Sequence, residues 1–442
     1  MQKLINFMEK YFVPLASRIG SQRHMVAIRD GFISIIPLVI IGSLAILVNN
    51  FPIKAYQDYM SSLFGHSWTS FAVYLYNGTF AIISLLIVFS ISHNLARSYQ
   101  AEPLPAELVS LIALIILLLQ PTNGSFVIPF DWLDASGLFV AIFVAIISTE
   151  IMVRLRQFLK FDRKGPIRMA PILSQSFATL LPMLVVLSLF SMLKLVFLSL
   201  GITNILEAFY NLIQSPLAGM ANTLGTAITI VFLAHLCWFL GIHGTNILEP
   251  VIQAMYLPAL QENMLALARG EVIPNVFTKP FFDSFVYMGG CGTTISLLLA
   301  LFIFSKRTRW RELVKLTFAQ GMFNINEPVV YGLPIVINPL FIIPFIMTPI
   351  VLTITSYSAT IIGLVPRTVA MVPWTTPPII SGFLVSGSIM GSALQLVNIV
   401  IGALLYLPFI IMAERMEMAK FRSDKGENSG GDRTNDFHNN NI

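Results

Sequence analysis

Residues 324–332 read NINEPVVYG, and this stretch decides where the chain must lie. Its Glu327 is the only Asp, Glu, Lys or Arg between Lys315 and Arg367. Holding an ionisable side chain within a membrane costs on the order of a few kcal/mol, so such a residue is by default a candidate functional group. Pro328 pushes the backbone of Glu327 out of the helical region. We therefore expect Glu327 at a bend and not on a smooth helix face.

The composition extends this apolar character to the whole chain. Of the 442 residues, 56% are hydrophobic and 11% are charged, whereas an ordinary soluble domain has roughly 25% charged residues. Seven runs hold no charged residue other than histidine, and most could form a helix of about 20 residues that crosses a bilayer. Because membrane barrels show short alternating segments instead, the sequence predicts an all-α polytopic membrane protein. The runs lie between Asp30 and Lys54, Asp58 and Arg97, Glu107 and Asp131, Arg168 and Lys194, Glu207 and Glu249, Asp283 and Lys306, and Arg367 and Glu414.

The distribution of charge predicts how the chain crosses the membrane. Short basic loops mark the cytoplasmic side, and basic residues cluster at 3–29, 154–168 and 306–315. Nine long apolar segments violate this rule, because they place the third cluster and the C-terminal end outside. One additional crossing within residues 245–279 repairs both errors, which gives about ten transmembrane helices and cytoplasmic termini. That stretch is interrupted by Pro250, Pro258, Gly270 and Pro274.

The two ends of the chain differ from its middle. Residues 1–29 mix apolar and basic side chains without the core or cleavage site of a signal peptide, which predicts a cytoplasmic amphipathic segment on the inner leaflet. Residues 423–442 are polar and rich in Gly and Asn, which predicts a disordered cytoplasmic tail. The net charge of +5 is explained by topology signals and contact with lipid headgroups, so no nucleic-acid partner is expected.

The second half of the chain has three broken segments that carry polar groups. Irregular backbone at membrane depth is tolerated only where protein or a water-filled cavity satisfies it, and in transporters such breaks commonly form the substrate site. We therefore expect a scaffold domain at 30–200, including a basic amphipathic connector at 154–170, and a transport domain at 201–422. The broken segments span residues 244–280, 320–334 and 367–387.

The residues at these breaks suit a sugar. Sugar hydroxyls need acceptors and donors such as carboxylates and amides, and the C–H faces of sugar rings pack on aromatic side chains. The stretches WFLGIHG, NINEP and PWTT supply these groups. The candidate substrate-binding residues are Glu327, His243, Asn326, Trp238, Trp374, Gly244 and Asn324.

Some of these residues also have a structural interpretation. Trp238 and Trp374 could anchor the chain at the membrane interface. His243 could be a helix-end histidine that bonds to the backbone, and Glu327 could have a purely structural role at a helix end.

The sequence lacks the residues that metal-dependent and nucleotide-dependent chemistry require. Cys237 and Cys291 lie in or beside apolar runs and form neither a CxxC pair nor a metal-ligand spacing. The sequence contains no Walker A loop, no nucleotide-binding fingerprint and no HExxH. We therefore expect no metal and no cofactor, and neither an ATP-driven pump nor a zinc protease.

Four motifs resemble those of a known family, the membrane-embedded IIC component of the phosphoenolpyruvate-dependent sugar phosphotransferase system (PTS). The closest match is to its lactose, cellobiose and diacetylchitobiose branch. The resemblance covers nearly the whole chain, and INEP with an upstream GIHG is quite specific to that group. The motifs are GIHGTN at 241–246, KPFFDSFVYMGGCGTT at 279–294, FNINEPVVYGLPIVINP at 323–339 and VPWTTPP at 372–378.

The resemblance implies a fold and a site. Members of the family have ten transmembrane helices plus re-entrant hairpins, form a homodimer through the N-terminal half, and carry sugar with the C-terminal half in an elevator-like motion. By motif match, the sugar-binding carboxylate falls on Glu327 and its partner histidine on His243. Beside them lie Asn326, Trp238 and, as a looser match, Trp374.

The resemblance also implies a phosphoryl donor. Some members carry a fused IIB domain with a phosphorylatable cysteine, and no cysteine follows Cys291 here. We therefore expect a separate phosphorylated IIB protein, itself supplied by IIA, to dock on the cytoplasmic face of a bacterial plasma membrane, with the connector at 154–168 as the candidate surface. The substrate would be a β-linked disaccharide such as diacetylchitobiose or cellobiose, with lactose as a further candidate. No independent catalysis is expected from the chain alone.

Alternatives remain open at the site and for the function. Glu327 could take the hydroxyl proton as a general base or could only bind the sugar. A cation-coupled secondary sugar transporter would use Glu327 and His243 as a proton relay. A membrane glycosyltransferase or hydrolase would need two facing carboxylates, and only Glu249 or Asp283 could supply the second.

Overall fold

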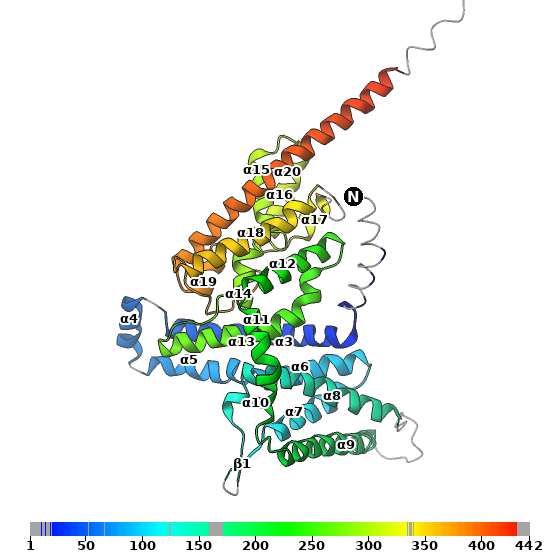
Figure 1. The fold of residues 1–442 in the computed structure, drawn as a ribbon, viewed down its shortest axis with the longest axis vertical. Coiled ribbons are helices and arrows are strands. Elements are labelled where there is room, and N and C mark those ends of the chain that lie inside the picture. The colour runs from blue at the N-terminus through cyan, green and yellow to red at the C-terminus, as the bar shows by residue number, and fades with distance from the viewer. Residues whose placement is uncertain are drawn as a thin grey trace, which may run out of the picture.

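The computed structural model describes residues 20–158 and 171–430, apart from 52, 66, 123, 124, 334, 336, 337 and 339, together with residues 10, 14 and 18. The described chain is almost wholly helical (Figure 1). Its one sheet is a small hairpin in which β1 (Gln120–Thr122) runs antiparallel to β2 (Ser125–Val127). The coarse prediction of a mostly helical protein with several apolar helices is confirmed.

The N-terminal half is a bundle that occupies the middle and lower parts of Figure 1. Helix α6 packs against α3, α7 and α8, around core residues such as Phe32, Ile87 and Leu114. Small residues let helices approach closely in a membrane, and a Cβ on Gly31 would lie only 2.6 Å from Cγ1 of Ile91. The helices are α3 (Arg23–Asn49), α4 (Lys54–Phe64), α5 (Trp68–Asn77), α6 (Ile83–Ser98), α7 (Pro103–Leu118), α8 (Leu138–Phe158) and α9 (Pro171–Ser199), with 3-10 turns at Phe80–Ile82, Phe130–Trp132 and Ala135–Gly137.

The C-terminal half is built from more helices, of which α12 and α14 to α20 occupy the upper part of Figure 1, while α13 lies beside α3 and α10 and α11 lie lower. Helix α20 packs against α15, α18 and α19, and α12 packs against α13 and α18. The helices are α10 (Ile205–Phe209), α11 (Ser215–Ala221), α12 (Leu224–Phe239), α13 (Gly244–Arg269), α14 (Lys279–Phe281), α15 (Thr294–Phe304), α16 (Thr308–Met322), α17 (Glu327–Gly332), α18 (Ile342–Ile361), α19 (Ile380–Ser386) and α20 (Ile389–Gly430), with π-helical turns at Tyr210–Gln214 and Phe282–Val286.

Fewer helices meet a strict test for membrane crossing than the sequence count of nine long segments. Within the described ranges, six helices are long and apolar enough to span a bilayer, or seven if a pair bent by 82° counts as one span. The count is lower because α7 and α15 are apolar but short. The six are Arg23–Asn49, Trp68–Ser98, Ala135–Phe158, Thr179–Ser199, Ile342–Ile361 and Ile389–Met416, and the bent pair joins Ile205–Ala221 to Leu224–Phe239.

Three predictions about where segments break, begin or end differ from the structure; two concern α13 and α3, and the third concerns the C-terminal tail. Helix α13 runs uninterrupted through Pro250 and Pro258, so the predicted breaks at these prolines were wrong, although the helix does end before Gly270. Helix α3 begins at Arg23, ahead of the boundary predicted at residue 30, because the Gln22 side chain caps it by accepting a hydrogen bond from the Met25 amide. Residues 1–9 and the connector residues 159–170 lie outside the described ranges.

The tail was predicted to be disordered from residue 423, but helix α20 continues to Gly430. The end of this helix is rich in Lys, Arg, Glu and Met, which all favour a helix, and one internal glycine costs only about 1 kcal/mol. The rest of the predicted tail, residues 431–442, lies outside the described ranges.

Candidate functional site

The structure brings His243 and Glu327 together at two helix starts. His243 caps α13, since its Nδ1 accepts a hydrogen bond from the Asn246 amide at 3.3 Å. This bond places the ring proton on Nε2, which lies 3.7 Å from Oε1 of Glu327. The separation is too long for a hydrogen bond. The two side chains are 39% and 45% exposed, so a donor and an acceptor face one opening.

Glu327 occupies the bend that the sequence predicted. It is the first residue of the short helix α17, and Pro328 follows in the first turn. Glu327 therefore lies at a helix start and not on a smooth helix face, as expected. The proline does not keep Glu327 out of the helix, because a proline is tolerated in the first turn.

A close backbone approach fixes the position of His243. Gly244, the first residue of α13, lies against helix α12, where a Cβ would come within 1.9 Å of the Ala234 carbonyl oxygen. Only glycine fits this space. Gly241, three residues earlier, has a φ of 79°, which favours glycine. Gly244 thus has a packing role here, and its predicted contact with substrate stays a prediction.

The two tryptophans differ in their surroundings. Trp238 is buried, and its ring centroid lies 4.4 Å from that of His243. Trp374 is 54% exposed and lies in the irregular segment between α18 and α19. Trp238 can therefore hold the imidazole in place, whereas Trp374 has a free face for a ligand.

Asn324 ties three segments together. Its side-chain oxygen accepts a hydrogen bond from the Gly289 amide at 2.7 Å. Its Nδ2 donates to the carbonyl oxygens of Trp374 at 2.5 Å and Thr376 at 3.2 Å. The residue has a φ of 62°, a left-handed conformation that asparagine tolerates better than most side chains. In this structure the side chain of Asn324 therefore serves backbone groups.

Asn326 has a similar arrangement. It is buried, precedes α17 directly, and donates from Nδ2 to the carbonyl oxygen of Cys291 at 3.0 Å. The predicted contacts of both asparagines with substrate stay predictions.

The sequence did not predict the buried ionic cluster of Lys279, Asp283 and Glu249, and Asp283 and Glu249 were considered only as a possible second carboxylate for a hydrolase. Lys279 Nζ lies 2.7 and 2.8 Å from the two oxygens of Asp283 and 3.7 Å from Oε1 of Glu249. Gln253 donates to the same Glu249 oxygen at 2.7 Å. The three charged side chains are 12–17% exposed. The spacing of Lys279 and Asp283, one helical turn apart, was the available signal, but the pairing with Glu249 depends on the fold.

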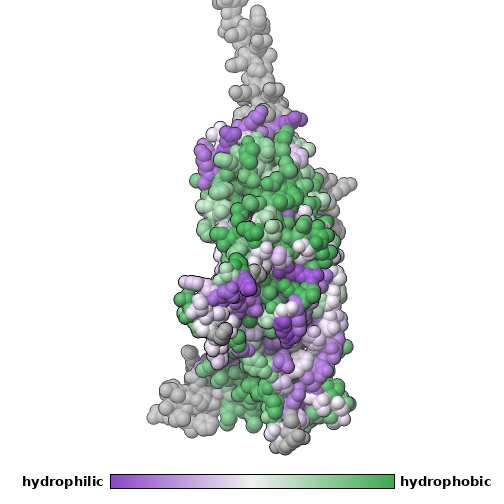
Figure 2. Space-filling view, turned by 90° about the vertical axis from the view of Figure 1, so that its left-hand side faces the viewer, coloured by the Kyte–Doolittle hydropathy of each residue, from purple (hydrophilic) through white to green (hydrophobic). Residues whose placement is uncertain are grey.

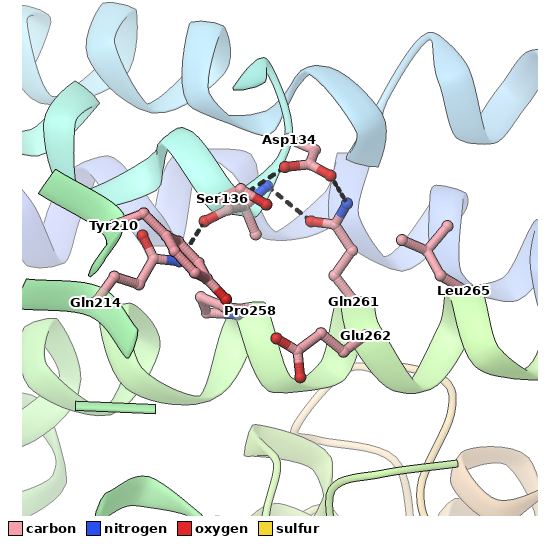
Figure 3. Close-up of a pocket in the computed structure, with 9 residues that line it drawn as sticks. Asp134, Ser136, Tyr210, Gln214, Pro258, Gln261, Glu262 and Leu265 are labelled. Carbon is pink, nitrogen blue, oxygen red and sulfur yellow. Dashed lines mark hydrogen bonds between the residues drawn. The ribbon is translucent and has the colours of Figure 1, made fainter. Parts of the chain in front are cut away.

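A separate small cavity lies at the other end of α13 (Figure 3). It has a volume of about 40 Å³ and lies between α13 and the loop that precedes α8. Gln261 of α13 donates to Asp134 at 2.6 Å and accepts a hydrogen bond from the Ala135 amide at 2.7 Å. The cavity is lined by Asp134, Ala135, Ser136, Tyr210, Gln214, Pro258, Gln261, Glu262 and Leu265.

Within a bundle of apolar helices, broken helices bring a carboxylate and a histidine to one opening. This arrangement defines a polytopic membrane protein of the transporter class. The family model described as "Phosphotransferase system, EIIC" matches residues 29–349. The chain therefore belongs to the EIIC family, the membrane-integral components that work with IIB and IIA in sugar uptake.

Two curated relatives and one solved structure illustrate the similarity. The PTS system cellobiose-specific EIIC component of Geobacillus stearothermophilus is 37% identical and covers 98% of this chain and 99% of its own length. The lichenan permease IIC component of Bacillus subtilis (strain 168) is 34% identical and covers 95% of each chain. The crystal structure of the transporter ChbC, the IIC component from the N,N'-diacetylchitobiose-specific phosphotransferase system, is similar with a TM-score of 0.88, 38% identity, and coverage of 94% of this chain and 99% of its own.

Proposed function

We propose that this protein carries a β-linked disaccharide of the cellobiose or diacetylchitobiose type across the membrane and presents it for phosphorylation by a separate phospho-IIB protein. The observation that carries the proposal is the open pair of His243 Nε2 and Glu327 Oε1, 3.7 Å apart at two helix starts. The gap suits a ligand hydroxyl, which can donate to the carboxylate and accept from the imidazole N–H. The relatives named for cellobiose and diacetylchitobiose support the substrate class.

Other residues complete the proposed site. Trp374 packs its exposed face on a sugar ring, while Trp238 holds the His243 ring from behind. Asn324 and Asn326 keep the bends around Glu327 in shape through their bonds to backbone groups. The proposal also keeps Asn324, Asn326 and Gly244 as contacts for a second part of the ligand.

The side of the membrane on which the site opens supports phosphorylation. Gly20, next to the basic start of α3, lies against Ile247 of α13, where a Cβ would be 2.7 Å from its Cγ1. Ile247 stands one turn after His243. Basic ends mark the cytoplasm, so the opening lies toward the side from which IIB approaches.

The chemical step is a phosphoryl transfer. The sugar hydroxyl oxygen attacks phosphorus, the P–S bond to the IIB cysteine breaks, and the cysteine leaves as a thiolate. The hydroxyl proton passes to a carboxylate oxygen of Glu327, which acts as general base. The phosphorylated sugar then carries a charge that prevents its return.

We propose a transport mechanism of the elevator type, in which one half of the protein moves the sugar site relative to the other half. About ten transmembrane helices with re-entrant hairpins form a scaffold at 30–200, through which two copies associate, and a transport half at 201–422 that moves the site. Both termini lie in the cytoplasm.

Sugar binding by the purified protein tests the proposal. Diacetylchitobiose, cellobiose and lactose are titrated against wild type, Glu327→Ala and His243→Ala. Each substitution removes a charged or polar partner of the ligand, so we expect affinity to fall by about tenfold to a hundredfold. Asp58→Ala, an exposed carboxylate on α4, is the matched control and should bind normally.

Two outcomes contradict the proposal. Unchanged binding in both site variants would remove the site assignment. Accumulation of unmodified sugar that collapses with a protonophore would favour the cation-coupled transporter instead.

A further inference from the structure

A basic patch stands at the start of helix α16. Residues 306–315 hold five basic side chains and one acidic one, and Lys306, Arg309, Arg311 and Lys315 are exposed. Hydrophilic residues cap the upper end of the molecule, above a broad hydrophobic band (Figure 2). Helix α16, which carries the patch, lies near this upper end (Figure 1), so the patch lies at the edge of the apolar surface, where a soluble partner can reach it.

Helix α16 presents this patch rigidly. Its buried stripe, Trp310, Val314, Thr317 and Gly321, faces the core, and Trp310 and Val314 belong to the same core cluster as Trp238 and Val329. The patch is thus fixed relative to the residues that hold His243 and Glu327.

Two of the basic side chains are occupied locally, and three are available. Arg311 Nε donates to the Ser305 carbonyl at 2.8 Å, and Arg307 donates to the Glu414 carbonyl at 3.4 Å. Lys306, Arg309 and Lys315 form no side-chain hydrogen bond or ion pair with any residue in the described ranges. Three cations are therefore directed to a ligand or to solvent.

The patch is directly connected to the candidate site. Helix α16 packs against α17, which begins at Glu327, and a Cβ on Gly332 would lie 2.5 Å from Cδ1 of Leu313. Exposed apolar side chains lie on these two helices and at the end of α16: Leu316 (74%), Phe323 (51%) and Tyr331 (61%). An apolar centre with a charged rim is the usual arrangement of a protein interface.

We infer that the exposed faces of α16 and α17 form the docking surface for the phosphocysteine-bearing IIB protein. This inference rests on the proposed function. A phosphoryl group carries a charge of about −1.5 to −2, and it must reach a hydroxyl held at Glu327. A partner that delivers it there must cover the adjacent helices. Lys306, Arg309 and Lys315 attract the acidic surface around the phosphocysteine, and the apolar side chains form the contact centre.

The rival occupant of the patch is the anionic lipid surface. Phe302, Ile303 and Phe304, directly before the patch, are 59%, 53% and 42% exposed, which places the patch near the membrane interface. A lipid contact does not bring a phosphoryl group to Glu327, whereas α16 packs against α17, which begins at Glu327, and this placement favours the protein partner.

The experiment measures phosphoryl transfer to bound sugar in nanodiscs of neutral lipid, with a purified cellobiose-type phospho-IIB chosen because it phosphorylates sugar on the wild type. The test variant is Arg309→Glu with Lys315→Glu. Charge reversal at an interface rim mainly slows association, so we expect the KM for phospho-IIB to rise about tenfold or more, with kcat and sugar affinity unchanged. Tyr331→Ala, which leaves the charges in place, should raise the same KM without altering its salt dependence.

A matched variant distinguishes this surface from the connector. Arg154→Glu reverses an exposed charge (72% exposed) on α8, and we expect no change in KM. An effect of Arg154→Glu without one at α16 would overturn the inference and place docking at the connector. An α16 effect seen only in anionic nanodiscs would assign the patch to lipid. If the wild type binds no such sugar, or if no cellobiose-type phospho-IIB transfers its phosphoryl group to sugar on the wild type, the proposed function itself is rejected.

Discussion

At the scale of single residues, Glu327 faces the same opening as His243, and the neighbouring tryptophans and asparagines differ in what they contact. A lone carboxylate before a proline predicts a functional bend, and helix α17 begins there. The contrast between the buried Trp238 and the exposed Trp374 depends on tertiary packing. The amides of Asn324 and Asn326 bond to backbone groups far away in sequence, which no local pattern announces.

The two candidate roles of Glu327 can be separated with Glu327→Gln. The amide keeps the shape and can still bond to a hydroxyl, but it cannot accept the proton. General-base catalysis contributes about 10²–10⁴-fold, so we expect transfer from phospho-IIB to fall by that amount while sugar affinity changes far less. Equal losses in transfer and in sugar affinity would leave Glu327 only as a binder.

Asn324→Asp tests whether the side chain of Asn324 holds the segments at Gly289, Asn324 and Trp374 together. Aspartate keeps the acceptor for the Gly289 amide and tolerates the left-handed backbone, but it places an anion against the carbonyl oxygens of Trp374 and Thr376. Unsatisfied buried partners cost about 1–3 kcal/mol, so we expect a lower melting temperature and weaker sugar binding. Asn204→Asp is the matched control, at a partly exposed asparagine that caps α10 through an acceptor oxygen that aspartate keeps. A variant as stable as wild type would show that the three segments hold their positions without this side chain.

At the scale of elements, α13 shows where a prediction from the positions of prolines failed. Prolines usually kink or end a helix, yet Pro250 and Pro258 lie inside 26 helical residues. Neighbouring helices can satisfy the freed backbone groups in a membrane protein, and α13 packs against α3 and α12. Such support is invisible in the sequence of one segment.

The ionic cluster beside α13 gives a prediction for this element. Lys279→Ala leaves the carboxylates of Glu249 and Asp283 buried without their cation. Breaking a buried pair costs about 3–5 kcal/mol, so the variant should melt at a much lower temperature. Adding Asp283→Asn to Lys279→Ala removes one of the two charges and should restore part of the loss. If the double variant melts lower than Lys279→Ala, the cluster is not governed by charge balance.

At the scale of the whole molecule, composition alone predicted a helical membrane protein, because few charged residues and long apolar runs leave little choice. The arrangement of the halves could not be derived in this way. Hydrogen bonds that join them include those of Gln261 and Gln214 with the loop at Asp134 and Ala135 (Figure 3), and those of Ser43 of α3 with the backbone of Met371. Ser43 Oγ donates to the Met371 carbonyl at 3.2 Å and accepts from its amide at 3.0 Å.

The contact between Ser43 and Met371 offers a test of the elevator. If the transport half slides along the scaffold, this contact must break in every cycle, so linking the two positions must stop transport. We expect Ser43→Cys with Met371→Cys, joined by a disulfide or a short bifunctional thiol reagent, to lose uptake in membrane vesicles while still binding sugar. Reduction of the disulfide should restore uptake.

A second cysteine pair makes this test specific. Ser110→Cys with Ser148→Cys joins α7 to α8, whose hydroxyls lie 2.6 Å apart within the scaffold. That crosslink leaves the boundary between the halves free, so uptake should continue. Full uptake with the Ser43–Met371 link in place would mean that the two halves keep this contact throughout the cycle, and that the sugar site opens to its two sides by a smaller local motion of the broken segments.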